Sequence, residues 1–103
     1  MMINVIATMK LNPGCRESFI ELVKGIVGPV RAEDGCIEYQ PAVDLESGIF
    51  NQSHEEDRVI IIEKWASLDL FHAHRTAPHV LEFKEANKDM VAEMTIMVLN
   101  EVK

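Results

Sequence analysis

The chain has 103 residues, of which 48% are hydrophobic and 26% charged, a composition typical of one globular domain spanning residues 1–103. Its formal net charge is −7, and its ten Lys and Arg residues are scattered without a basic run. Such a chain repels phosphate backbones and acidic lipid surfaces, which excludes nucleic acid and membranes as expected partners.

The first elements predicted are a strand and a long helix. Residues 2–10 are rich in β-branched side chains and predict a strand. Asn12 and Pro13 then predict a helix start, with Asn12 as the N-cap and Pro13 at the first helical position. Apolar residues at three- and four-residue spacing extend this helix to about Glu33. Pro29 should kink the helix or end its regular part.

Two further strands follow. Residues 36–44 predict a strand that Pro41 places at a sheet edge or a bulge, and residues 49–53 predict a short continuation of it. Residues 58–65, RVIIIEKW, give the strongest strand signal in the chain. Their unbroken apolar run predicts burial on both faces of the sheet.

The last third of the chain predicts two helices and a strand. Ser67 should cap a short helix with the sequence LDLFHAHR, and a second helix should begin at residues 76–78 and run to about Asp89. Residues 93–102 predict the last strand, again apolar on both faces in its middle.

The order β-α-β-β-α-β predicts an α+β, ferredoxin-like fold: an antiparallel four-stranded sheet with helices on one face. The helices can cover only one face, whereas residues 58–65 and 93–102 are apolar on both. We therefore expect a second copy of the chain to cover the other face, sheet to sheet, in a homodimer.

The two cysteines indicate a reducing compartment. Cys15 and Cys36 have no partner at CxxC spacing, and the first residues lack a basic segment followed by a long apolar stretch. We expect a cytoplasmic protein in which both are free thiols that pack as small apolar residues.

Three of the four histidines lie within eight residues, HAHRTAPH. A metal site is disfavoured there, because His72 and His74 would project about 200° apart on a helix. Pro78 prevents a continuous helix that would bring His79 onto the same face as His72. No metal is therefore expected.

The same stretch predicts an acid–base pair. The helix break puts His74 in the last turn of one helix and His79 in the first turn of the next, where the helix dipoles act with opposite sign. His74 should hold its proton more tightly, with a raised pKa, and His79 should be biased towards neutral. The alternative is that both only satisfy helix ends or face solvent.

Three other residues are candidates for binding a substrate. Glu63 and Trp65 lie two apart on one strand, so they share a face, and a carboxylate there needs a partner. Tyr39 could donate a phenolic hydrogen bond to an aromatic substrate. Packing in the core is the alternative for Trp65 and Tyr39.

The chain resembles the antibiotic-biosynthesis monooxygenase superfamily, in particular its small bacterial quinol monooxygenases. The resemblance rests on VIATMKLNPG, EDGCIEYQPAVD, IIEKWASLDLFHAHRTAPH and VAEMTIMVL, in this order. It implies a dimeric α+β barrel and the oxygenation of quinols or related aromatics by O2 without metal, flavin or other cofactor. It also implies that Tyr39, Glu63, Trp65, His74 and His79 occupy recurrent site positions.

A cofactor-free reaction would begin by removing a phenolic proton from the substrate. A phenol has a pKa of ~10 and histidine one of ~6.5, so this transfer is uphill by roughly 5 kcal/mol and the phenolate must be stabilised. We expect His79 to be the base, and protonated His74 or the Trp65 N–H to hold the anion.

Two other functions stay open. His74 to His79 also match an H-x-T-x-P-H element of a superfamily branch that processes a phosphorylated quorum-sensing sugar derivative. A dimer that binds a ligand without turning it over is the non-catalytic alternative.

Overall fold

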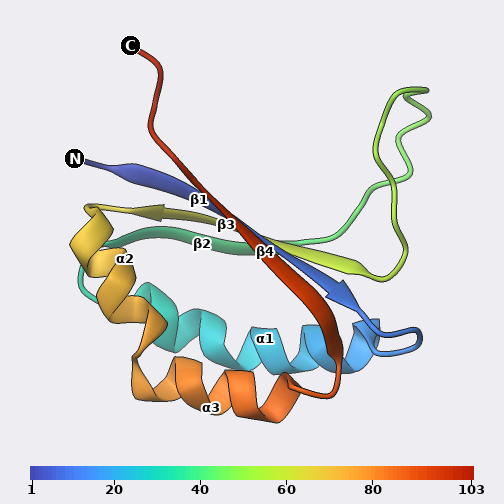
Figure 1. Cartoon of the computed structure of the whole chain (residues 1–103), viewed down its shortest axis with the longest axis horizontal. Helices are drawn as coiled ribbons and strands as arrows, with labels where there is room; N and C mark the ends of the chain where they lie inside the picture. Colours follow the sequence, from blue (N-terminus) through green and yellow to red (C-terminus); the bar gives the residue numbers. More distant parts are fainter.

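The computed structural model describes residues 1–103 and contains four strands and three helices (Figure 1). In chain order they are β1 (Ile3–Leu11), α1 (Arg16–Arg31), β2 (Cys36–Ala42), β3 (Arg58–Trp65), α2 (Leu68–Arg75), α3 (Pro78–Asn87) and β4 (Val91–Leu99). The strands form one antiparallel sheet in the order β2-β3-β1-β4. The predicted ferredoxin-like α+β fold is confirmed, with α2 and α3 as the second helical segment.

All three helices lie on one side of the sheet, below it in Figure 1. Alternate residues of β1 and β3 point towards them, because successive side chains of a strand face opposite sides. These residues are buried: Ile3, Val5, Ala7, Met9, Leu11, Val59, Ile61, Glu63 and Trp65. Phe19 and Val23 of α1 pack against them and are fully buried, which stabilises the fold by about 1.5–3 kcal/mol for each side chain.

The opposite face of the sheet is apolar and uncovered in the single chain. Register places Ile6 opposite both Ile62 and Met97, with Ile60 and Leu99 close by on the same face. Ile62 is 38% exposed and Met97 53%. The β2–β3 loop (43–57) and the C-terminal tail both project beyond this face in Figure 1.

The predicted start of the first helix is wrong. α1 begins at Arg16 with Cys15 at the N-cap, and Gly14 before it has φ +84°, outside the helical region. The side-chain amide of Asn12 donates to the main-chain oxygen of Asp89 at 3.0 Å instead of capping α1. Asn12 therefore joins the end of β1 to the turn before β4.

Most other helix and strand boundaries agree more closely with those predicted from the sequence. α1 continues past Pro29 to Arg31, and β2 with Pro41 is an edge strand as predicted. The expected strand at residues 49–53 is absent, since these residues lie in the β2–β3 loop. Ser67 caps α2 by accepting from the Leu70 N–H, and α3 begins with Pro78 at its first position.

The chain has two free thiols, Cys15 and Cys36, both half-buried beside the core. None of its helices combines the length and the apolar character that a membrane crossing requires.

The α1–β2 turn packs tightly against α2. Gly35 has φ +80°, its carbonyl accepts from the Ala66 N–H at 2.8 Å, and a Cβ at position 35 would clash with the Leu70 side chain. The absence of a side chain at Gly35 therefore allows the end of α1 and the start of α2 to approach each other.

We predict that Gly35→Ala destabilises the protein by about 2–4 kcal/mol, since it adds overpacking to the backbone strain of a positive φ. Gly14→Ala is the matched control, because Gly14 has φ +84° with nothing within 4 Å of the added Cβ. It should cost only the backbone strain, about 1–2 kcal/mol. Urea unfolding measures both, and equal losses would contradict a steric role for Gly35.

Candidate active site

A cavity of about 240 Å³ lies between the sheet and the helices, slightly below the usual range for ligand pockets of roughly 300–1,000 Å³. Its lining is mostly apolar and includes Met9 and Met94. Six lining residues carry polar groups: Tyr39, Glu63, His74, Arg75, Lys84 and Asn87. A larger, more open groove of about 520 Å³ runs between α1 and the edge strand β2, but no carboxylate or imidazole lines it.

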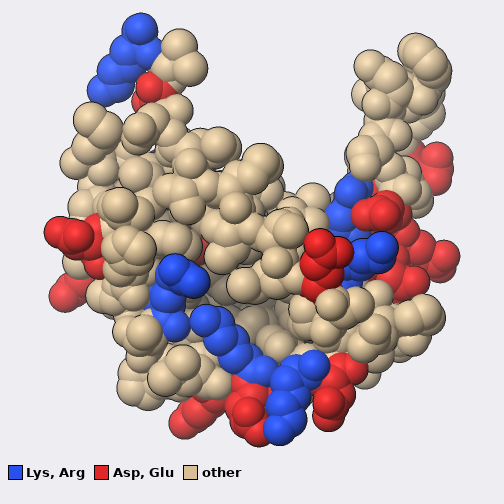
Figure 2. Space-filling view, viewed as in Figure 1, with Lys and Arg blue, Asp and Glu red and all other residues tan.

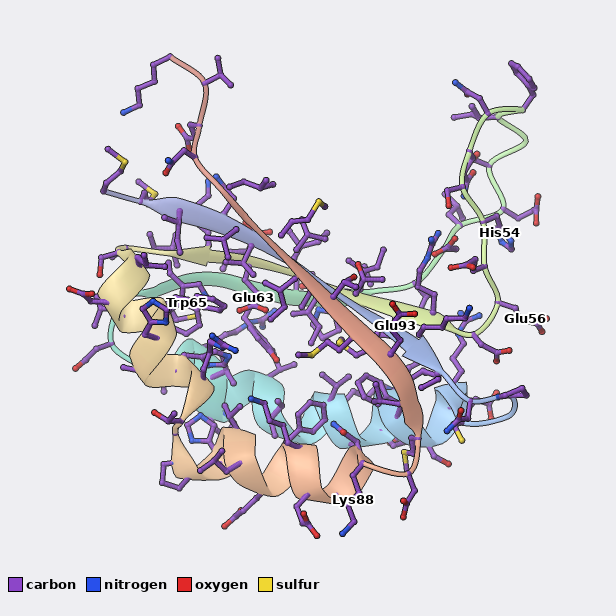
Figure 3. All side chains as sticks on the ribbon, in the orientation of Figure 1. His54, Glu56, Glu63, Trp65, Lys88 and Glu93 are labelled. Carbon is purple, nitrogen blue, oxygen red and sulfur yellow. The ribbon has the colours of Figure 1, made fainter.

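Glu63 is a buried carboxyl on the helix-facing side of β3, where Figure 3 shows it near Trp65. Trp65 Nε1 donates to Glu63 Oε1 at 2.9 Å, so the two residues predicted to share a face also bind each other. Burial raises the pKa of Glu63 to about 7, and the nearby charge of Glu33 adds to this, although the Trp65 hydrogen bond acts the other way. Glu63 can therefore lose or gain a proton near neutral pH.

His74, in the last turn of α2, is surrounded by aromatic rings. Its ring centroid lies 4.7 Å from that of Trp65 and 5.8 Å from that of Tyr39, and it stacks on Phe71 at 6.1 Å. Only 8% of its side chain is exposed. Its Nε2 lies 4.0 Å from Glu63 Oε1, which brings the two titratable groups together at one end of the cavity.

Glu33, which the sequence did not single out, bridges the two histidines. Its Oε2 lies 2.9 Å from His74 Nδ1 and 2.8 Å from His79 Nε2. A carboxylate only accepts hydrogen bonds, so both ring nitrogens donate to it. In neutral His74 the proton is then on Nδ1, and Nε2 on the cavity side is the free acceptor.

Sequence reasoning missed Glu33 because it is 41 and 46 residues away from its partners. The only local signal is its place before Asp34-Gly35, in the turn that leaves α1. Because Gly35 packs against α2, this turn brings Glu33 close to the helix that carries His74.

The expected direction of the His74 pKa is wrong. The helix-end argument predicted a raised pKa, whereas burial lowers the pKa of His74 below its ordinary value, and the hydrogen bond to Glu33 only partly opposes this. The free energy needed to move an imidazolium out of water is larger than the stabilisation it gains from a helix end, which is about 0.3–1 kcal/mol at exposed sites.

The other two histidines of HAHRTAPH have different surroundings. His79, in the first turn of α3, has a 30% exposed side chain, and it is not part of the cavity wall. His72 is exposed and His74 buried, so the prediction that they face opposite sides of the helix is confirmed. The structure contains no group of three or more side chains placed to bind a metal ion.

Tyr39 lines the cavity, whereas Trp65 does not. The Tyr39 hydroxyl has no hydrogen-bond partner within the protein, and burial, together with the charges of Glu63 and Glu33, raises its pKa above the ordinary value. Tyr39 is therefore a neutral donor that faces the cavity. The Trp65 N–H is already used by Glu63, so it does not hold a substrate anion directly.

Comparison with known proteins gives related sequences and folds. The profile of the antibiotic biosynthesis monooxygenase family matches residues 2–86. The probable quinol monooxygenase YgiN of Escherichia coli K12 is 37% identical over 100 residues, covering 95% of this chain and 96% of YgiN.

Solved structures show the same fold. PA3566 from Pseudomonas aeruginosa superposes with a TM-score of 0.83 at 25% identity, over 99% of this chain and 95% of that one. Rv0793 from Mycobacterium tuberculosis gives a TM-score of 0.82 at 22% identity, over 100% and 97%.

We predict that Glu63→Gln stabilises the protein at pH 8 relative to wild type, and much less at pH 5. A carboxyl whose pKa rises on folding binds more protons in the folded than in the unfolded state, so its contribution to stability is lost as pH rises from about 4.5 to 7. The loss is roughly 3 kcal/mol. Urea unfolding of both proteins at both pH values measures the difference in their free energy of unfolding. Both proteins keep His74, so its titration contributes to both. A gain that does not depend on pH would contradict the raised pKa.

Proposed function

The chain belongs to the antibiotic biosynthesis monooxygenase family, and on that premise we propose that it oxygenates a quinol or related aromatic substrate with O2, without a bound cofactor. The observation that carries the proposal is the cavity, where His74, Glu63 and Tyr39 face an otherwise apolar space. The name of YgiN, a probable quinol monooxygenase, supports the substrate class.

His74 is the proposed base. Its free Nε2 faces the end of the cavity that holds Glu63, and Glu33 stabilises the imidazolium as it forms, as the carboxylate of a catalytic triad does. Deprotonating a phenol with an ordinary histidine is uphill by roughly 5 kcal/mol. Hydrogen bonds to the phenolate from the Tyr39 hydroxyl and from protonated Glu63 lower this barrier.

His79 acts through Glu33 and not on the substrate. It shares Oε2 of Glu33 with His74, and its side chain is 30% exposed, so the three residues form a line from the cavity to solvent. This replaces the initial assignment of His79 as the base.

The proposed reaction balances without electrons from the protein. A quinol and O2 give a hydroxyquinone and water: one oxygen atom forms the new C–O bond and the other becomes water. The substrate supplies all four electrons, two from quinol oxidation and two from the C–H bond that is replaced. The protein's role is to form and hold the electron-rich phenolate that O2 oxidises.

We also propose that the active form is a homodimer joined through the open face of the sheet. The apolar centre of that face includes Ile6, Ile62 and Met97, and a monomer leaves it in water. The loop after β2 carries Leu45, 74% exposed, and Phe50, 98% exposed, and projects beyond the same face. A second copy would cover both features.

Oxygen consumption with a panel of reduced quinones tests the proposed activity against its alternatives. An enzyme that isomerises a phosphorylated sugar derivative would convert its substrate without oxygen uptake. A non-catalytic dimer would bind quinols and leave them reduced.

We predict that His74→Gln lowers quinol-dependent oxygen uptake by about 10²–10⁴-fold, the usual contribution of a general base. His79→Gln should lower it less, since Glu33 can still orient His74. His72→Gln is the control, because His72 is exposed on the same helix. Turnover at the wild-type rate in His74→Gln would contradict the proposed base.

We predict that Ile62→Glu converts a dimer into monomers, because it puts a charge in the apolar centre of the proposed interface. Light scattering after size exclusion should give twice the chain mass for wild type and one chain mass for the variant. Leu81→Glu, at a residue of α3 that is 50% exposed, should stay dimeric. A monomeric wild type at micromolar concentration would refute the dimer.

A further inference from the structure

The wall of the cavity contains two cations without an acidic partner. Arg75 and Lys84 both line it, both are exposed, and neither takes part in any ion pair of the structure. The chain as a whole carries a net charge of −7, so two neighbouring positive charges without an acidic partner differ from the rest of the molecule, which is mostly acidic. Figure 2 shows Lys and Arg side chains gathered on the helical side of the hollow on this face.

The two cations are held near each other by the backbone. Lys84 Nζ donates to the main-chain oxygen of Arg75 at 3.5 Å, which joins the middle of α3 to the end of α2. Arg75 directly follows His74, whose ring is buried in the same cavity. The cavity therefore has titratable groups at its buried end and positive charge where it meets solvent.

Asn87 supplies a second, independent observation. It is only 8% exposed, it lines the cavity, and its side-chain amide has no hydrogen-bond partner in the protein. No fully buried polar atom of the chain lacks a partner, so the Asn87 amide keeps some accessible surface for a ligand or water. Lys84 and Asn87 are three residues apart on α3 and therefore neighbours on one face of the helix.

We propose that the cavity selects an aromatic substrate that carries an anionic substituent. Arg75 and Lys84 bind the anion, the Asn87 amide donates a hydrogen bond to it, and the phenolic end of the ring reaches His74. This inference rests on the proposed function and adds the substrate class. Two partly solvated charges and one buried amide should favour the anion about tenfold.

The test compares 6-hydroxy-2-naphthoate, whose hydroxyl and carboxylate lie at opposite ends of the ring system, with 2-naphthol, which lacks only the carboxylate. Neither is a quinol, so titration calorimetry measures binding apart from turnover. Wild type should bind the naphthoate about tenfold more tightly than the naphthol, and the preference should shrink as salt is added. In the double variant Arg75→Gln, Lys84→Gln it should fall below about twofold, with naphthol binding unchanged.

Lys24→Gln, Lys88→Gln is the matched control. It removes two positive charges from exposed residues that pair with Glu21 and Glu85 and do not line the cavity. Lys88 lies at the far end of α3 in Figure 3. This variant should keep the tenfold preference, and Asn87→Leu should weaken naphthoate binding more than naphthol binding.

Several results would overturn the proposal: no preference in wild type, a preference that survives in the Arg75, Lys84 double variant, or no binding of either aromatic. Tighter binding of ribose 5-phosphate than of the naphthoate would also overturn it, because the ligand would then be a sugar phosphate. A protein that shows the predicted preference but consumes no oxygen with any quinol would refute the monooxygenase proposal alone.

Discussion

One carboxylate oxygen holds the candidate site together. Oε2 of Glu33 accepts from both His74 and His79, and this joins the ends of α1 and α2 to the start of α3. Burying a carboxylate costs free energy unless hydrogen bonds satisfy it. Glu33 therefore needs the two imidazole donors, and they need its oxygen as an acceptor. Gly35, two residues on, makes the contact possible by letting the turn approach α2.

Burial changes the pKa values of the two groups at the end of the cavity in opposite directions and reverses their order. It raises the pKa of Glu63 to about 7 and lowers that of His74 from its ordinary value of 6.5. The carboxyl of Glu63 therefore holds its proton more tightly than the imidazole of His74, which lies 4.0 Å away. This order favours a neutral imidazole that can act as a general base beside a protonated carboxyl that can donate a hydrogen bond.

Local patterns predicted most of the fold and part of the site. Pro41 indicated an edge strand, Ser67 a helix cap and Pro78 the break between α2 and α3, because each of these effects acts within a few residues. Asn12-Pro13 failed as a helix start because Gly14 adopts a positive φ and Asn12 binds Asp89, a contact far along the chain. Glu33 and the lowered pKa of His74 were out of reach for the same reason, since both depend on which distant residues surround the site.

Successive side chains of β3 alternate between the two faces of the sheet, and this separates the cavity from the proposed dimer interface. Ile61 and Glu63 face the helices and line the cavity, whereas Ile60 and Ile62 face the open side. A second copy can therefore cover the open face without entering the cavity. In the proposed dimer it would also restrain β3, whose other face places Glu63 beside His74, so dimerisation would be coupled to the geometry of the site through one strand.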